Sequence, residues 1–186
     1  LMGRMPLHGG SPTEDDVDIV SALLEAVDCT ALGGRAFSTL STGERQRVQL
    51  ARAIAQVSPA PDPGDEDDPA VSHERFLLLD EPTSSLDPAH QHTAMRLLRR
   101  QADAGIGVLA VLHDLNLAAA YADRIALMKD TRIIETGDPT RIMDAALLER
   151  IFEVPMLVLP HPSLPHPLVV AQPTLLPNSD SRSDSQ

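Results

Sequence analysis

Residues 76–88 read FLLLDEPTSSLDP, and this stretch decides the fold. It opens with four apolar residues and then turns abruptly to Asp80, Glu81 and Pro82. A short unbroken apolar run is typical of a strand that is buried on both faces of a parallel sheet. The two carboxylates then lie at the carboxyl edge of the sheet, where α/β proteins bind their ligands. Residues 76–79 are therefore predicted to form a buried strand that presents two acids at a ligand site.

Helices and strands alternate on both sides of this strand, which predicts an α/β fold. Asp87 and Pro88 are a suitable N-cap and first residue for the next helix, and Gly105 is a suitable end. Ser41 and Glu44 fit a capping box at the start of an earlier helix. In chain order the pattern predicts helices at 14–27, 41–57 and 87–104, a strand at 106–112, a helix at 115–122, strands at 124–128 and 132–135, and a helical segment at 139–152.

Composition limits the classes of function. The net charge of −12 and the pI near 4.8 argue against binding to nucleic acid, which needs an excess of Lys and Arg. No apolar run approaches the roughly 20 residues of a membrane helix. Residues 58–74 are rich in Pro and acid and are predicted to be a solvated insertion. Residues 156–186 are predicted to be an extended Pro-rich tail with a disordered end, in which His161 and His166 are solvated.

Three segments carry the chemistry, and each has an ordinary structural explanation when it is taken alone. The segment LSTGERQRVQLARA begins at Leu40, and its capping box is a common feature of helices. Asp80 and Glu81 alone fit a strand-end turn with solvated acids. His113 alone fits a cap at the end of a strand. Their order along the chain and their positions at element ends favour a shared site.

Taken together, these segments resemble the nucleotide-binding subunit of ABC transporters. The segment at Leu40 is similar to the signature motif, residues 76–88 are similar to Walker B with its D-loop, and His113 is similar to the switch histidine. The resemblance covers nearly all of residues 1–155. It implies part of a P-loop NTPase domain (an ABC ATPase), with a parallel sheet flanked by helices and part of the helical subdomain.

The resemblance divides residues 1–155 into the C-terminal regions of such a domain. Residues 14–57 would be the helical and signature region, and residues 58–74 an insertion. Residues 75–155 would be the Walker B and switch-histidine region. Residues 156–186 would follow as the tail.

The resemblance also implies ATP and Mg²⁺ as cofactors and gives single residues a role. It makes Asp80 a Mg²⁺ ligand, and Glu81 and His113 the catalytic residues that polarise the attacking water and contact the γ-phosphate. The residues implied to contribute to nucleotide binding across a dimer are Ser41, Thr42, Gly43, Glu44 and Asp87. Thr42 departs from the family, which usually has Gly there, so the loop must adopt a conformation that a β-branched residue tolerates.

No G-x-x-x-x-G-K-[ST] motif occurs among the 186 residues. In the family, the backbone N–H groups and the lysine of this loop hold the β- and γ-phosphates. We therefore expect a truncated, inactive fragment that neither binds ATP tightly nor hydrolyses it alone. Paired with an intact subunit, it would still offer Ser41 and Gly43 to the partner's phosphate loop.

The resemblance predicts an ATP-hydrolysing energy-coupling subunit of an ABC importer, peripheral to the cytoplasmic face of the inner membrane. Its implied partners are a second ATPase subunit in a homodimer, transmembrane permease subunits and a substrate-binding protein, with no nucleic acid. The insertion at 58–74 and the ending EVPMLVLPHPSLPHPLVV are similar to hemin importers. A siderophore or cobalamin importer is the alternative substrate class, and a soluble, non-transport ABC protein is the alternative outside transport.

Overall fold

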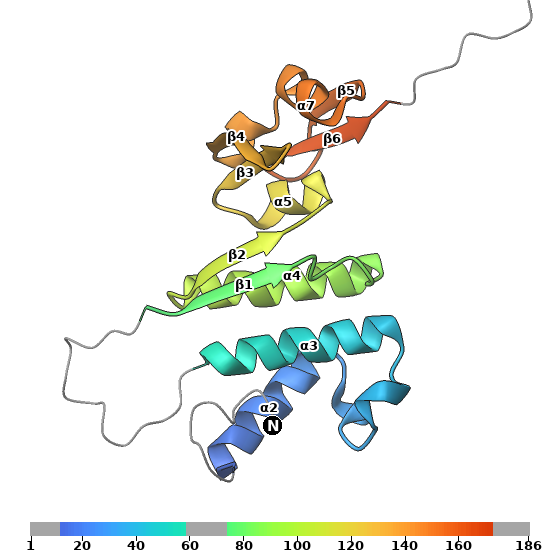
Figure 1. Cartoon of the computed structure of the whole chain (residues 1–186), viewed down its shortest axis with the longest axis vertical. Coiled ribbons are helices and arrows are strands. Elements are labelled where there is room, and N and C mark those ends of the chain that lie inside the picture. Colours follow the sequence, from blue (N-terminus) through green and yellow to red (C-terminus); the bar gives the residue numbers. More distant parts are fainter. Residues whose placement is uncertain (1–11, 59–73, 173–186) are drawn as a thin grey trace, which may run out of the picture. The chain divides into compact units, whose positions relative to one another are not determined.

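The computed structural model describes residues 12–58 and 74–172, and the chain divides into two compact units (Figure 1). The first unit is Leu1–His113 and the second is Asp114–Gln186. The predicted extent of the ATPase portion, residues 1–155, stays a prediction. The predicted insertion lies almost entirely outside the described residues, as does the end of the predicted tail.

Helices at the start of the first unit begin at the caps that the sequence predicted. Helix α2 (Glu14–Ala26) and helix α3 (Thr42–Val57) each begin with a complete capping box. In the first box Thr13 Oγ1 accepts from Asp16 N at 3.2 Å, and Asp16 Oδ2 accepts from Thr13 N at 3.0 Å. Two 3₁₀ turns, η1 (Thr30–Leu32) and η2 (Phe37–Thr39), connect the helices. Helix α3 then packs against α2 on one side and against α4 and β1 on the other.

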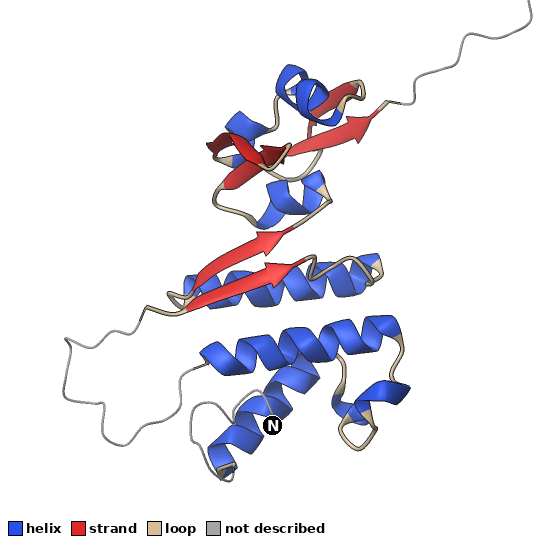
Figure 2. Ribbon diagram, in the orientation of Figure 1, coloured by secondary structure: helices blue, strands red, loops and turns tan. Residues whose placement is uncertain are grey.

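Two parallel strands carry the site. Strand β1 (Phe76–Asp80) pairs with β2 (Gly107–Val111), and helix α4 (Pro88–Asp103) connects them. Figure 2 shows α4 running along this pair. The register places Asp80 opposite Val111, so both strands end at the same edge. The predicted βαβ arrangement is therefore confirmed.

The predicted burial of this strand on both faces is wrong for the described residues. Successive side chains of a strand point to opposite faces of the sheet. Leu77 is 5% exposed, whereas Phe76 and Leu78 are 61% and 71% exposed. Leu109 on β2 is 63% exposed in the same way. Helices pack against the face that carries Leu77, and within residues 12–58 and 74–113 no element covers the other face.

The second unit packs short helices against two antiparallel hairpins. Its elements are α5 (Leu115–Tyr121), β3 (Ile125–Lys129), β4 (Arg132–Gly137), α6 (Pro139–Ile142), α7 (Ala145–Phe152), β5 (Met156–Pro160) and β6 (Pro167–Ala171). The single helical segment predicted through Phe152 is two helices, because Asp144 starts α7 by accepting from Leu147 N at 2.8 Å. Across the described ranges, no helix combines the length and the apolar character that crossing a bilayer requires.

The predicted tail is folded in its first part. Residues 156–171 form the hairpin β5–β6, and Met156 and Val169 are buried in the core of the second unit. Asn116 on α5 holds the hairpin, since its side chain donates to Val169 O at 3.0 Å and accepts from Val169 N at 2.8 Å. Pro160 and Pro167 form the last pair of the ladder, where a missing N–H does little harm. The prolines therefore bound the strands and do not prevent them.

Candidate functional site

Two residues that the sequence predicted as catalytic meet at the carboxyl end of the parallel pair. Glu81 directly follows β1, and His113 comes two residues after β2. His113 Nε2 lies 2.5 Å from Glu81 Oε1, and the two side chains are 75% and 41% exposed. A carboxylate only accepts hydrogen bonds, so the ring nitrogen donates here. The pair presents an accessible carboxylate, held by a histidine, at the edge where α/β proteins bind ligands.

The backbone of Glu81 is held in an uncommon conformation. Its φ is 47°, in the left-handed region of backbone conformation that residues other than Gly, Asn and Asp seldom adopt. Glu81 N donates to Val111 O at 3.1 Å, which extends the β1–β2 ladder by one bond. Glu81 O accepts from Gln46 Nε2 at 3.0 Å and from Ser84 N at 3.3 Å. These bonds hold the main chain of Glu81, and His113 holds its carboxylate.

Gln46 is a site residue that the sequence analysis missed. It lies on α3, one turn beyond Gly43, so the two residues share a helix face. A Cβ added to Gly43 would lie 3.1 Å from Ser85 O, which shows how closely this face approaches the turn after β1. The helical spacing from Gly43 is the only sequence signal for Gln46. The first turns of α3 therefore pack directly on the loop that carries Glu81.

The start of α3 confirms the predicted capping box. Ser41 Oγ accepts from Glu44 N at 3.3 Å, and Glu44 Oε2 accepts from Ser41 N at 2.7 Å. The hydrogen bond from Ser41 N holds the pKa of the Glu44 carboxyl below its usual value. Thr42 is the first residue of the helix and has no positive φ, so a β-branched side chain is tolerated there. The Glu44 N–H is taken by Ser41 Oγ, whereas the N–H groups of Thr42 and Gly43 have no partner within the helix and can bind an anion.

Asp80 is the residue that fits a magnesium ion. It is the exposed last residue of β1, next to Glu81. In the described part of the chain, no three His, Cys, Asp or Glu side chains cluster closely enough to hold a metal. Mg²⁺ keeps several waters and is commonly bound by one or two carboxylates together with substrate phosphates. One exposed carboxylate at a strand end fits that mode of binding.

Asp87 confirms its predicted place as the N-cap of α4. Its Oδ1 accepts from His90 N at 3.0 Å, and its Oδ2 lies 2.8 Å from His90 Nδ1. These two bonds, the backbone one first, hold the pKa of the Asp87 carboxyl below its usual value. The sequence analysis gave His90 no role. The structure makes it the main partner of Asp87.

The predicted site residues lie in the first unit, on three short segments. Asp80, Glu81 and His113 share the edge of β1 and β2, and the approach of Gly43 to Ser85 brings the start of α3 against the loop after β1. The nucleotide-binding and catalytic roles of these residues stay predictions. Their placement puts two carboxylates and one histidine at the same edge of the β1–β2 pair.

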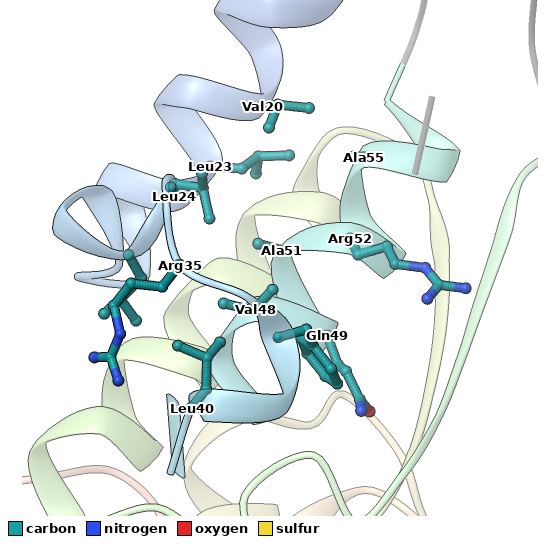
Figure 3. Close-up of a pocket in the computed structure, with 13 residues that line it drawn as sticks. Val20, Leu23, Leu24, Arg35, Leu40, Val48, Gln49, Ala51, Arg52 and Ala55 are labelled. Carbon is teal, nitrogen blue, oxygen red and sulfur yellow. The ribbon is translucent and has the colours of Figure 1, made fainter. Parts of the chain in front are cut away.

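An apolar pocket lies between α2 and α3 (Figure 3). It is lined by α2, the 3₁₀ turns and α3, and Leu23, Leu40 and Val48 are among its walls. No predicted site residue lines it. Of the described residues that line it, only Arg35 and Arg52 are charged. The pocket is therefore separate from the edge that carries Glu81.

The two histidines of the hairpin loop are partly accounted for by local contacts. The ring centroids of His161 and His166 lie 5.1 Å apart. His161 Nδ1 accepts from the backbone N–H groups of Ser163 and Leu164 at 3.2 and 3.1 Å. The histidine ring thus closes the turn between β5 and β6. His161 is partly exposed, and it belongs to an ordered turn, whereas the sequence predicted a loose tail.

The chain is similar to bacterial proteins that are named hemin import ATP-binding proteins. The protein from Myxococcus xanthus is 44% identical over 172 residues, which are 92% of this chain and 61% of that protein. The protein from Pseudomonas putida is 46% identical over 171 residues, which are 92% of this chain and 62% of that protein. The chain thus spans about three fifths of the length of these relatives. No family model matches the chain.

Solved structures show the same fold. A metal-chelate type ABC transporter in an inward-facing conformation matches 92% of this chain and 64% of its own, at 27% identity and a TM-score of 0.70. A dimeric ATP-binding cassette with ADP and Pi bound, in a post-hydrolysis state, matches 74% of this chain and 53% of its own, at 25% identity and a TM-score of 0.58. Both the predicted resemblance and the predicted fold class are confirmed. The chain is homologous to the ATP-binding proteins of ABC transporters and has the α/β fold of part of their ATPase domain.

Proposed function

We propose that this chain provides the signature, Walker B and switch-histidine part of an ATP-hydrolysing subunit that powers an ABC importer of hemin. The observation that carries the proposal is the Glu81–His113 pair beside Asp80, at the edge of β1 and β2. The relatives named for hemin import support the cargo, because they match 92% of this chain at about 44% identity. A siderophore or another metal chelate is the second candidate, which the metal-chelate type structural neighbour favours.

The arrangement supports a hydrolytic role for each residue. Glu81 would accept a proton from, and orient, the water that attacks the γ-phosphate. His113 would hold the Glu81 carboxylate through Nε2 and present the ring to the same phosphate. Asp80 would hold Mg²⁺, which when bound neutralises charge on the β- and γ-phosphates. Gln46 would keep Glu81 in place through the hydrogen bond to its carbonyl oxygen.

The start of α3 supports a site that is completed between two subunits. The N-terminus of a helix attracts anions through its free N–H groups and its dipole. Ser41 and Gly43 would therefore face the γ-phosphate held by a second ATPase subunit, and one structural neighbour is indeed dimeric. We infer a homodimer that sits on permease subunits at the cytoplasmic face of the inner membrane and works with a substrate-binding protein. The net charge of −12 counts against a soluble relative that acts on nucleic acid.

The chain on its own is expected to bind ATP only weakly. Its sequence contains no phosphate loop. None of the predicted site residues therefore supplies the backbone N–H groups and the lysine that bind the β- and γ-phosphates. Isothermal titration of the purified 186-residue chain with Mg-ATP should give a dissociation constant weaker than about 1 mM, that is, less than about 4 kcal/mol of binding free energy. A micromolar constant would show that a different nucleotide site exists.

The proposed function is tested in a hybrid protein. The part of the Myxococcus xanthus relative that this chain does not match is joined to this chain, and the hybrid is expressed in a bacterium that lacks its own hemin import ATPase. The strain is expected to grow with hemin as its only iron source, while this chain alone and the empty vector do not support growth. Growth on a ferric siderophore and not on hemin would favour the second candidate. Recovery of ribosomes and no permease with the tagged hybrid would contradict a transport role.

A further inference from the structure

A chain of polar contacts links Asp87 to the signature helix. His90 Nδ1 lies 2.8 Å from Asp87 Oδ2, and His90 Nε2 lies 3.0 Å from an Arg47 NH1 nitrogen. Arg47 is on α3, whose first turn carries the signature residues, and His90 is in the first turn of α4. Residues 43 positions apart in the sequence thus connect two segments that the resemblance assigns to nucleotide binding across a dimer.

The chemistry of these partners fixes the tautomer of His90. An arginine side chain has only donors, so His90 Nε2 must accept from Arg47 with its lone pair. The ring proton then resides on Nδ1 and is donated to Asp87, which as a carboxylate can only accept. The direction of donation runs from Arg47 through His90 to Asp87. A ring protonated on both nitrogens would lose the acceptor and would face the Arg47 guanidinium with a like charge.

Arg47 is itself anchored, so it can serve as a fixed donor. Its NH1 nitrogen also lies 2.9 Å from Val27 O and 2.8 Å from Asp28 O, so the two hydrogens of NH1 are shared among three acceptors and one of these hydrogen bonds is bifurcated. The Arg47 side chain is only 14% exposed, and the Asp28 carboxylate lies 3.6 Å from it and 3.8 Å from His90 Nε2. Asp28 has a φ of 54°, which turns its carbonyl group at the end of α2 toward the arginine. The donor is therefore held by α2 and α3 together.

A helix cap by itself does not require this arrangement. The cap uses Asp87 Oδ1 and the backbone N–H of residue 90, which any residue except proline supplies. The ring of His90 and the guanidinium of Arg47 act on the other oxygen, Oδ2. The second bond removes the remaining rotational freedom of the carboxylate. It also ties the loop after β1 to α3 at a second point, besides the bond from Gln46 to Glu81.

We propose that Arg47 and His90 are positioning residues, which fix the direction of the Asp87 carboxylate relative to the signature end of α3 through one neutral Nδ1–H histidine. The importance of Asp87 rests on the proposed function and on the resemblance, which implies that Asp87 contributes to nucleotide binding across the proposed dimer. The hydrogen bonds from Arg47 through His90 to Asp87, called the relay below, connect the loop after β1 to the signature helix α3 within one subunit. A shift of α3 would then be transmitted to Asp87 through His90, in the first turn of α4.

The first test is the tautomer of His90 in the full chain. Two-dimensional long-range ¹H–¹⁵N spectra of the uniformly labelled 186-residue chain, recorded where the rings are neutral, show which ring nitrogen carries the proton. His90→Gln identifies the His90 signals among the seven histidines by their loss. We expect Nδ1 to be the protonated nitrogen of His90. A ring protonated on Nε2, or an average of both tautomers, would overturn the relay, because Nε2 could not then accept from Arg47.

The second test uses a conservative variant. Glutamine offers one donor and one acceptor, so His90→Gln can replace the neutral ring, whereas His90→Ala cannot. Titration of the Asp87 carboxyl by ¹³C spectra should give a higher pKa in His90→Ala than in the parent chain, and a return toward the parent value in His90→Gln. His92→Gln, the same change at an exposed neighbour on α4, should leave the titration unchanged. An Asp87 pKa that is equal in the Ala and Gln variants would contradict the proposal.

Neither measurement needs nucleotide. The relay and the proposed transport function can therefore be tested, and contradicted, independently of each other. If the hybrid does not support import and His90 carries its proton on Nδ1, the relay stands and the transport role does not. If the hybrid is active and His90 carries its proton on Nε2, the reverse holds. The tautomer is read in the unaltered chain, so a variant that fails to fold does not remove the test.

Discussion

Glu81→Gln, introduced into the hybrid protein that carries a phosphate loop, is expected to lower the rate of ATP hydrolysis by about 10²–10⁴-fold, the usual contribution of general acid–base catalysis. The amide keeps the size of the side chain but has lost the carboxylate that accepts a proton from water. The backbone contacts from Gln46 and Val111 involve only main-chain atoms of residue 81, so they persist in the variant. The loss should therefore appear in kcat, with little change in nucleotide affinity.

Phosphate release at saturating Mg-ATP measures this effect, and titration with a non-hydrolysable analogue measures affinity. Glu25→Gln is the matched control, because it makes the same change at an exposed position on α2. The control should hydrolyse ATP at the parent rate. A Glu81→Gln hybrid that keeps its rate within a few-fold would show that another group activates the water, and the role proposed for the pair with His113 would be withdrawn.

Ile142→Ala is expected to destabilise the second unit by about 2–5 kcal/mol, the usual range for deleting a large buried aliphatic side chain. Ile142 is 0% exposed and packs in one cluster with Leu148 and Met156. Its side chain also lies beside Gly137, where an added Cβ would be 3.4 Å from it. The cavity would thus open at the junction of α6 with β4, and the neighbours could close it only in part.

Ile133→Ala is the control for this prediction, because Ile133 lies in the same unit and is 62% exposed. Surface changes of this kind usually alter stability by less than about 0.5 kcal/mol. Hydrogen exchange of the amides in 114–172, followed across a urea series, reports on the second unit alone. Equal losses of protection in the two variants would mean that the packing around Ile142 contributes little to the stability of this unit.

Local features of the fold were predictable from the sequence, because they depend on residues three positions apart. The caps at Thr13, Ser41 and Asp87 all formed as the sequence indicated, and so did the stop near Gly105. In each cap a short side chain accepts from a backbone N–H within the same turn. Such bonds need no information from the rest of the chain.

Features that depend on distant partners were not predictable in this way. The hairpin at 156–171 was missed because Asn116, which holds Val169, is 53 residues away in the sequence. The exposed face of β1 was missed because an apolar run shows that a strand can be buried and does not show what covers it. Proline-rich composition indicated a tail, yet the prolines that matter fall at the ends of strands.

The candidate site shows the same division. Motif order placed Asp80, Glu81 and His113 together, and the structure brings Glu81 and His113 into contact across 32 residues. Gln46 and the Arg47–His90 pair were missed, because a polar residue on a helix carries no sign of which distant carbonyl or ring it will reach. The residues proposed to act in hydrolysis could be recognised from the sequence, whereas the residues that orient them could be identified only in the three-dimensional structure.

The left-handed backbone of Glu81 bears on how this protein responds to selection in the laboratory. Holding a non-glycine residue at a φ of 47° costs on the order of 1–3 kcal/mol. Libraries screened only for thermal resistance should therefore accumulate Gly or Asn at position 81, since both residues adopt this conformation readily. Such variants would resist heat better but would lack the carboxylate that is proposed to activate water. Directed evolution of the hybrid protein would therefore need a screen for ATP turnover together with the screen for thermal resistance.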